Sequence, residues 1–182
     1  IYIQLQSVNQ ATGSNGSALQ ITYASDGLGN NIDVAAMKYM SGRNFFIIAV
    51  NSGATQIGSV GYSQLWSVSM NSSGTLTKKQ KLNVSGRILD IQPIGTVSGA
   101  YTLMVFLTNS SGVHVQAFTV DSSGNFTAGT THSPSSTNGY AQAENGKMAW
   151  NRDFTRVGIT WVRASDEKAF VSCAAWSGTA FS

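Results

Sequence analysis

The segment VHVQAFTVDSSGNFT, at Val113–Thr127, alternates apolar and polar residues, passes through a Ser-Ser-Gly turn and begins a return strand. Alternation with a period of two marks a strand with one buried face, and Ser and Gly favour tight turns. A close copy, LWSVSMNSSGTLT, occupies Leu65–Thr77, and looser copies lie at Ala18–Leu28 and Ala169–Phe181. The recurrence of this hairpin predicts a chain built from a repeated β-unit.

The composition fits a single folded domain with an unusually uncharged surface. The 182 residues are 42% apolar, but only 10% are charged, against about 25% in an average soluble domain. Ser, Thr, Asn, Gln and Gly must therefore supply the polar surface, a composition typical of extracellular proteins. The net charge is only +3, and the basic clusters are Lys78–Lys81 and the group Arg152, Arg156 and Arg163. The lysines fit a solvated strand edge that discourages pairing with another edge. We expect no nucleic-acid partner.

Other compositional features restrict the possibilities further. No run of 18 apolar residues exists, so we expect no membrane span. Cys173 is the only cysteine, which rules out an intrachain disulfide. Its apolar neighbours predict a small buried side chain, with a disulfide to another chain as the alternative. The chain begins at Ile1 without a methionine, which fits a processed chain or a segment of a longer one.

Three continuous apolar runs predict strands that are buried on both faces. Alternating strands are expected at Ile1–Asn9 and Ala18–Ser25, with an Asp26-Gly27 hairpin turn after the second. Ile32–Met40 predicts a tightly packed inner strand, with a short helix as the alternative. The three apolar runs are Phe45–Val50, Tyr101–Leu107 and Arg156–Val162.

The turn glycines Gly27, Gly74, Gly124 and Gly178 recur about every 50 residues. Each interval predicts an inner apolar strand, a buried strand, an alternating strand and a polar return strand. We therefore expect a single all-β domain over 1–182, with about four antiparallel repeat units at approximately 1–31, 32–84, 85–139 and 140–182. The first and last units are incomplete, and their unpaired terminal strands predict self-association. Closure of a ring and membership of a longer array are the alternatives.

The two hairpins at Leu65–Thr77 and Val113–Thr127 resemble the third-strand hairpins of lactonase-like and lectin-like β-propellers. A four-stranded unit of 40–50 residues is also the period of a propeller blade. The chain lacks the Gly-His and Trp-Asp signatures of WD40 blades, the paired glycines of kelch blades and any acidic calcium loop. A β-sandwich or a viral jelly roll is the alternative fold, because both also alternate short strands with Gly turns.

No arrangement of residues predicts catalysis. His114 and His132 are not spaced as a metal pair. The resemblance to lactonase-like and sugar-hydrolysing propellers implies acidic residues at a central tunnel, and only Asp33 and Asp90 lie in predicted inner strands, at comparable places in successive units. Structural pairing explains them equally well. Cys173 has no recognisable histidine partner. We expect no enzyme, no cofactor and no metal site.

Aromatic residues permit a second interpretation. The resemblance to lectin-like propellers implies aromatic side chains that line the grooves between blades and stack on sugars. The alternative is that tryptophans at alternating positions fill the space between sheets. The candidates for either role are Trp66, Trp150, Trp161, Trp176, Tyr23 and Tyr101.

Five N-glycosylation sequons fall mostly at predicted turns or strand ends, where a glycan requires an exposed asparagine. Asn/Ser/Thr-rich chains also generate sequons by chance. We predict that at least one carries a glycan if the source has the machinery. The asparagines are Asn15, Asn71, Asn83, Asn109 and Asn125.

These observations predict a secreted, non-enzymatic structural or adhesive protein at the cell surface, such as a subunit of a filament, sheath or coat. The first alternative is a carbohydrate-binding, lectin-like propeller that takes glycans as partners. The second is a viral coat protein. A lactonase-like enzyme ranks last.

Overall fold

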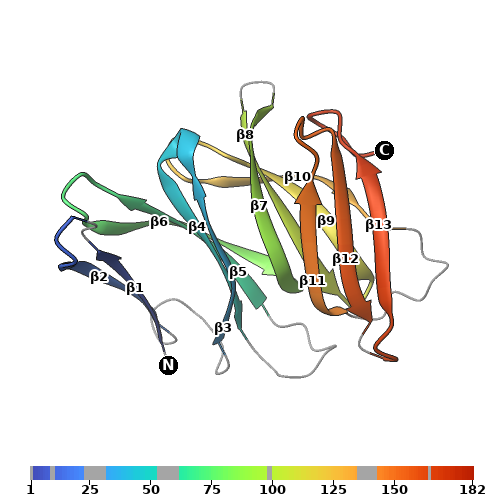
Figure 1. The fold of residues 1–182 in the computed structure, drawn as a ribbon, viewed down its shortest axis with the longest axis horizontal. Helices are drawn as coiled ribbons and strands as arrows, with labels where there is room; N and C mark the ends of the chain where they lie inside the picture. The colour runs from blue at the N-terminus through green and yellow to red at the C-terminus, as the bar shows by residue number, and fades with distance from the viewer. Residues whose placement is uncertain are drawn as a thin grey trace.

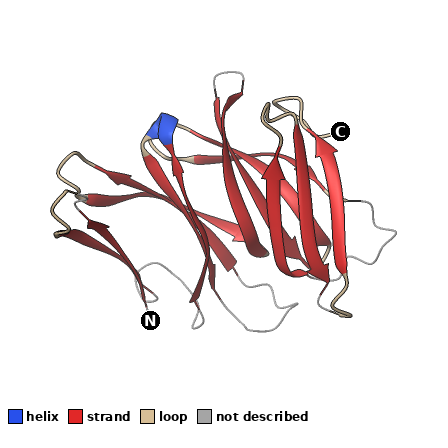
Figure 2. Cartoon of the chain, in the orientation of Figure 1, coloured by secondary structure: helices blue, strands red, loops and turns tan. Residues whose placement is uncertain are grey.

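The computed structural model describes residues 2–8, 11–22, 32–52, 62–97, 100–134, 143–163 and 165–182. These residues form strands and turns, with no α-helix and a single 3-10 turn at Ser41–Arg43 (Figure 2). The prediction of an all-β, antiparallel fold is confirmed. The predicted Asp26-Gly27 turn lies outside the described residues.

The strands form four antiparallel sheets, and each sheet is made from consecutive strands of the chain. Sheet I pairs β1 (Tyr2–Val8) with β2 (Asn15–Thr22). Sheet II contains β3 (Ile32–Met40), β4 (Phe45–Ser52), β5 (Tyr62–Met70) and β6 (Leu76–Ser85). Sheet III contains β7 (Arg87–Val97), β8 (Ala100–Asn109), β9 (Gly112–Val120) and β10 (Phe126–His132). Sheet IV contains β11 (Ala143–Trp150), β12 (Arg156–Arg163) and β13 (Ala169–Ala175).

The four sheets stand in a row, with sheet I at one end and sheet IV at the other (Figure 1). The first strands of sheets II, III and IV are neighbours, because β7 contacts both β3 and β11. The outer strands also follow one another, since β6 contacts both β2 and β10. The described strands close neither a barrel nor a ring of sheets.

The sheets repeat one another in detail. The hairpin of the first two strands has a bulge at the same level in sheets II, III and IV: between Val34 and Ala36, Ile88 and Asp90, and Ala143 and Asn145. A bulge adds one residue to one strand and increases the local twist. A shared bulge therefore fixes which residues are equivalent from sheet to sheet.

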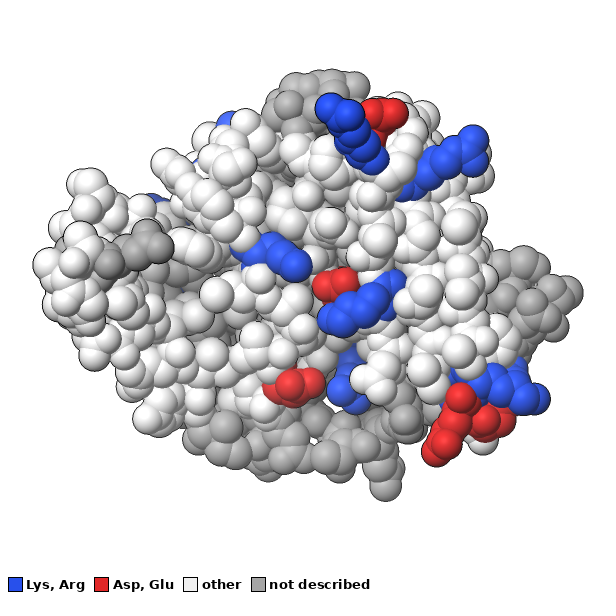
Figure 3. Space-filling model, in the orientation of Figure 1, with Lys and Arg blue, Asp and Glu red and all other residues white. Residues whose placement is uncertain are grey.

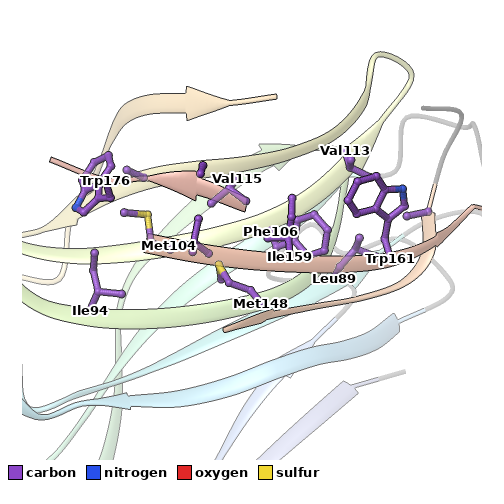
Figure 4. Packing of buried hydrophobic residues seen from close by; sticks show 14 residues of the cluster. Leu89, Ile94, Met104, Phe106, Val113, Val115, Met148, Ile159, Trp161 and Trp176 are labelled. Carbon is purple, nitrogen blue, oxygen red and sulfur yellow. The ribbon is translucent and has the colours of Figure 1, made fainter. Parts of the chain in front are cut away.

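Three apolar layers, one between each pair of adjacent sheets, form the core. The layer between sheets III and IV is drawn in Figure 4, where Met104 and Phe106 of β8 lie close to Met148 of β11 and Ile159 of β12. Each inner sheet contributes to two layers, so its strands carry apolar residues on both faces.

Two of the three apolar runs are buried on both faces as predicted, but the third run and the first strand of sheet II differ from the prediction. In Arg156–Val162, within β12, Arg156 and Thr160 are exposed, so this strand is buried on one face only. In β4, Ile47, Ile48, Ala49 and Val50 are 0% exposed. Ile32–Met40 does form a strand and not a helix. Its side chains are largely exposed, however, because the two-stranded sheet I covers little of β3, whereas β7, also an edge strand, contacts both β3 and β11 and is largely buried. The expectation of a tightly packed inner strand was wrong.

The first repeat unit also differs from the prediction. The segment Ala18–Leu28 was aligned with the third strands of later units, but β2 contacts the outer strand β6 and is itself an outer strand. The true counterpart of β5 is β1, since YIQLQSV at Tyr2–Val8 matches YSQLWSV at Tyr62–Val68. Aligning the units on Gly27 obscured this match, because Gly27 follows β2 in the sequence, whereas Gly74 and Gly124 follow the third strands β5 and β9.

Candidate functional site

Equivalent serines attach sheets I and II to the hairpin turn of the sheet that follows each. Ser67 of β5 donates its hydroxyl hydrogen to the carbonyl oxygen of Gly124, at 2.9 Å, in sheet III. Ser7 of β1 donates in the same way to Gly74 of sheet II, at 2.7 Å. In both cases a serine hydroxyl on one sheet holds the hairpin turn of the following sheet.

The turns need glycine for two reasons. Gly74 and Gly124 have φ angles of 81° and 86°, in the left-handed region that side chains disfavour. A Cβ atom on Gly124 would also lie 2.5 Å from the Ser67 hydroxyl oxygen. The repeated Ser-Ser-Gly turns are therefore explained by contact between sheets, which requires no ligand.

A second repeated contact joins the second strand of one sheet to the first strand of the next. Asn51 of β4 accepts a hydrogen bond from the Ile88 backbone N–H, at 2.8 Å, and donates to the Ile88 carbonyl, at 2.9 Å. Thr108 of β8, at the equivalent position, accepts from the Ala143 backbone N–H at 3.1 Å. These side chains thus bond backbone groups of β7 and β11, which are edge strands of their sheets.

The two acidic residues expected at comparable places occupy different environments. Asp90 is 7% exposed and accepts hydrogen bonds from the backbone N–H groups of Ile91 and Met148, at 3.0 and 3.1 Å. It therefore connects sheet III to sheet IV. Asp33 is exposed and lies 3.5 Å from Arg87 in a surface ion pair. The bulges show that the two positions are not equivalent, and the expectation that they are was wrong.

The first groove, of about 450 Å³, spans sheets II, III and IV near these acids. Asp33, Arg87, Lys147 and Thr160 supply its polar groups, and Phe170 forms part of its wall. Three of these residues are charged, although the face seen in Figure 3 is mostly uncharged.

The second groove, also of about 450 Å³, lies between sheets II and III, and its described lining contains no Lys, Arg, Asp or Glu. His114 lies in it, with Nδ1 2.7 Å from the Ser133 hydroxyl and Nε2 3.0 Å from Asn109 Oδ1. Burial lowers the pKa of His114 below its usual value. Gln116 and Thr131 add neutral polar groups. The groove is therefore uncharged at neutral pH.

The second histidine, His132, does not line this groove. His132 ends β10 and packs against the ring of Phe181, with the ring centroids 5.7 Å apart. Burial also lowers the pKa of His132. In the part of the chain that the structure describes, no three His, Cys, Asp or Glu side chains gather as a metal site would require.

The tryptophans mainly fill the layers between sheets. Trp66, Trp161 and Trp176 are 4–5% exposed and belong to the apolar clusters. Trp66 Nε1 donates to Gln64 at 3.0 Å, and Trp161 stacks on Phe170 with centroids 5.5 Å apart. Only Trp150 is partly exposed among the four. Packing accounts for the three buried tryptophans without a sugar.

The predicted lysine edge is confirmed, and the predicted burial of the cysteine is wrong. Lys78 and Lys81 lie on β6, an edge strand of sheet II, with their ammonium groups 5.4 and 5.6 Å from the Trp66 ring centroid. Cys173 is exposed, because alternation along β13 points it toward the uncovered side of sheet IV.

The outer faces of the two end sheets have no covering sheet among the described residues. On sheet I, Tyr2 is 57% and Val8 is 61% exposed. On sheet IV, Val171 is 74% exposed. Large apolar side chains at this exposure mark surfaces that suit a partner when they recur on one face.

The five predicted sequon asparagines lie at turns or along outer strands. Four are exposed and Asn109 is half-buried. Most also act as hydrogen-bonding groups within turns: Asn71 Oδ1 accepts from the Ser73 and Thr75 N–H groups, and Asn125 Nδ2 donates to Asp121. The predicted residues do not converge on one site; they are Asn15, Asn71, Asn83, Asn109 and Asn125.

Comparison with known proteins identifies no relative: no protein-family model, curated protein or solved structure matches the chain. Within the described residues, no helix has the length and apolar character needed to cross a membrane.

Proposed function

We propose that this chain is a secreted, non-enzymatic structural or adhesive protein, a propeller-like β-repeat that serves as a subunit of an extracellular filament, sheath or coat. The observation that carries the proposal is the pair of uncovered end faces, on sheets I and IV, with Tyr2, Val8 and Val171 exposed. Stacked repeats usually need polar outer faces on their terminal units to stay soluble. Exposed apolar side chains on both end faces therefore favour association.

The propeller-like arrangement is supported by the order of the strands. Sheets II and III are both four-stranded meanders, and their first strands are neighbours along with that of sheet IV. A sandwich would place its strands in two sheets, whereas the described strands form four. The secreted location is supported by the 10% charged composition and by exposed sequons at Asn15 and Asn71.

Sedimentation velocity across a concentration series, followed by negative-stain electron microscopy, tests this function. We expect the sedimentation coefficient to rise with concentration and the images to show chains or sheets of particles. A chain that stays monomeric at its highest soluble concentration would contradict the proposal. Closed shells that enclose nucleic acid would instead favour a viral coat protein.

A carbohydrate-binding function is the second candidate, supported by the uncharged groove between sheets II and III. Neutral polar groups above an apolar floor suit the hydroxyls and ring faces of a sugar. Calorimetric titration with neutral oligosaccharides tests it, with Gln116→Ala expected to weaken binding. Gln20→Ala, an exposed substitution on β2 outside the groove, is the matched control. Equal binding by both variants would contradict a site in this groove.

A further inference from the structure

The outer face of sheet IV, turned away from sheet III, matches faces that are covered elsewhere in the molecule. Counted from the shared bulge, Val171 occupies the position of Ser67 in sheet II and of Ala117 in sheet III. Ser67 is 0% and Ala117 is 4% exposed, because the next sheet covers them. Val171 is 74% exposed.

The neighbouring positions follow the same pattern. In sheets II and III the equivalents of Thr160, Val162 and Ala169 are all 0% exposed, whereas these three residues are exposed or half-buried in sheet IV. Sheet IV thus presents the half of the repeating interface that receives a following sheet. The covered equivalents are Ile47 and Met104, Ala49 and Phe106, and Leu65 and Val115.

The outer face of sheet I, turned away from sheet II, presents the other half. The match of YIQLQSV to YSQLWSV makes Gln4, Gln6 and Val8 the counterparts of Gln64, Trp66 and Val68. Those three residues of sheet II point toward the preceding sheet and are 1%, 4% and 0% exposed. On sheet I the same positions are exposed.

We propose that a second copy of this chain docks the outer face of its sheet I onto the outer face of sheet IV, so that the row of sheets continues from copy to copy. The inference rests on the proposed structural function and specifies its interface. The argument for the occupant is continuity: each internal boundary joins these same two kinds of face. An interface between unlike faces is heterologous, and its repetition produces a ring or an open filament.

The side chains on the two faces are compatible. Val8 and Val171 supply apolar contacts, and Gln4, Gln6 and Thr160 supply neutral hydrogen-bonding groups. The exposed Lys147, paired with Thr160, adds one positive charge to the face of sheet IV, and no acidic side chain lies beside it in the pairing with β12. The turn of sheet I contains Gly13, whose φ of 67° matches the left-handed glycines in the turns of sheets II and III. Nothing lies within 4 Å of a Cβ built on Gly13, so its surroundings are open to a partner.

The contact area is smaller than at an internal boundary between complete sheets. Sheet I has two strands, whereas sheets II and III have four. Its residues are also less apolar than their internal equivalents, since Gln6 stands where sheet II has Trp66. We therefore expect a reversible, concentration-dependent contact.

Complementation between two blocked variants tests the interface. Val8→Asp blocks the face of sheet I, and Val171→Asp blocks the face of sheet IV, because each would bury an unpaired carboxylate. Each variant alone should lose self-association by at least about tenfold in the dissociation constant. An equimolar mixture should form 1:1 dimers and nothing larger, because each dimer retains one intact interface. Met37→Asp, at a residue 52% exposed on sheet II, is the matched control and should associate like wild type.

Each outcome decides a separate point. Dimers that form in the mixture, and in neither variant by itself, establish the head-to-tail interface. Wild-type association that neither variant weakens overturns this interface and leaves the proposed structural function standing. A wild-type chain that is monomeric throughout overturns both. Thermal melting of each variant confirms that loss of association does not come from unfolding.

Discussion

Ser67 on β5 donates a 2.9 Å hydrogen bond to the carbonyl oxygen of Gly124 in the neighbouring sheet, and its hydroxyl oxygen accepts another from the Gln80 backbone N–H at 3.1 Å. One buried hydroxyl therefore serves both the boundary between two sheets and the bulge within its own sheet. Another hydrogen bond crosses the same boundary, where Arg43 Nε of sheet II donates to the Val120 carbonyl oxygen of sheet III, at 3.3 Å.

Ser67→Ala should destabilise the protein by about 1–2 kcal/mol, because it leaves the Gln80 N–H and the buried Gly124 carbonyl without their partner. Urea unfolding followed by tryptophan fluorescence measures the change. Ser72→Ala, at an exposed turn position, is the control and should change the free energy of unfolding little. Equal effects at the two positions would show that the contact between Ser67 and Gly124 contributes nothing.

Gly124→Ala should be costlier than Gly13→Ala. Both glycines have positive φ angles, 86° and 67°, so each substitution carries about 1–2 kcal/mol of backbone strain. At Gly124 the new methyl group also collides with the Ser67 side chain, whereas at Gly13 it meets nothing within 4 Å. The difference in unfolding free energy between the Gly124→Ala and Gly13→Ala variants measures the cost of the clash with Ser67. A smaller loss of stability for Gly124→Ala than for Gly13→Ala would contradict the close contact between the two sheets at Gly124.

Sequence alone predicted the strands because their side chains face a core on one or both sides. Phe45–Val50 is apolar throughout, and Tyr101–Leu107 is apolar except for Thr102, since the sheets that contain them are covered on both faces. The turns at Gly74 and Gly124 were found because their backbone requires glycine. These features depend on local conformation and burial, which residue type encodes.

Features that depend on the neighbouring sheet were not predictable in the same way. Cys173 sits in an apolar run, yet it is exposed because no described sheet covers that face. Asp33 and Asp90 looked equivalent until the bulges fixed the register. The one available signal that was missed is the match between Tyr2–Val8 and Tyr62–Val68, which locates the third strand of the first unit directly.

Asp90→Ala should cost more stability than Asp90→Asn. The buried carboxylate accepts from the Met148 and Ile91 N–H groups, and hydrogen bonds to charged groups contribute about 1.5–3 kcal/mol. An asparagine keeps one acceptor oxygen, whereas alanine keeps none. Thermal unfolding of both variants, with Asp33→Ala as the exposed control, checks the order. A loss at Asp33 as large as that at Asp90 would contradict the assigned roles.

Stability should fall on mild acidification. Burial lowers the pKa of His114 and of His132 below the reference value of 6.5, so the unfolded chain binds more protons between the folded pKa and 6.5. The free energy of unfolding then rises with pH across that window. The contribution of the two neutral histidines to stability is complete above 6.5 and is lost as the pH falls through their folded pKa. Arg163 and Lys168 hydrogen-bond Asp166 and lower its pKa, which adds a loss only below about pH 4.

Urea unfolding at about pH 7.5 and about pH 5 measures this dependence. The variant His114→Gln with His132→Gln should show a smaller difference between the two conditions, because glutamine does not titrate. Asp166→Asn, in the exposed turn after β12, serves as the control and should leave the difference unchanged at these pH values. An unchanged slope in the double histidine variant would contradict the assignment to the two imidazoles.

The sequons should differ in occupancy when the chain is expressed through a eukaryotic secretory pathway. Asn71 is exposed at a hairpin turn, whereas Asn109 is half-buried and its side-chain oxygen lies 3.0 Å from His114 Nε2 and 2.8 Å from the Ser111 N–H. A glycosylating enzyme must reach the asparagine side chain, so we expect glycan at Asn71 and little at Asn109. Intact mass should exceed 19.2 kDa, and Ser73→Ala should remove one glycan while Ser111→Ala removes none. A secreted chain with the unmodified mass would contradict glycosylation at Asn71. Loss of one glycan from each of the two serine variants would contradict the expected order of occupancy.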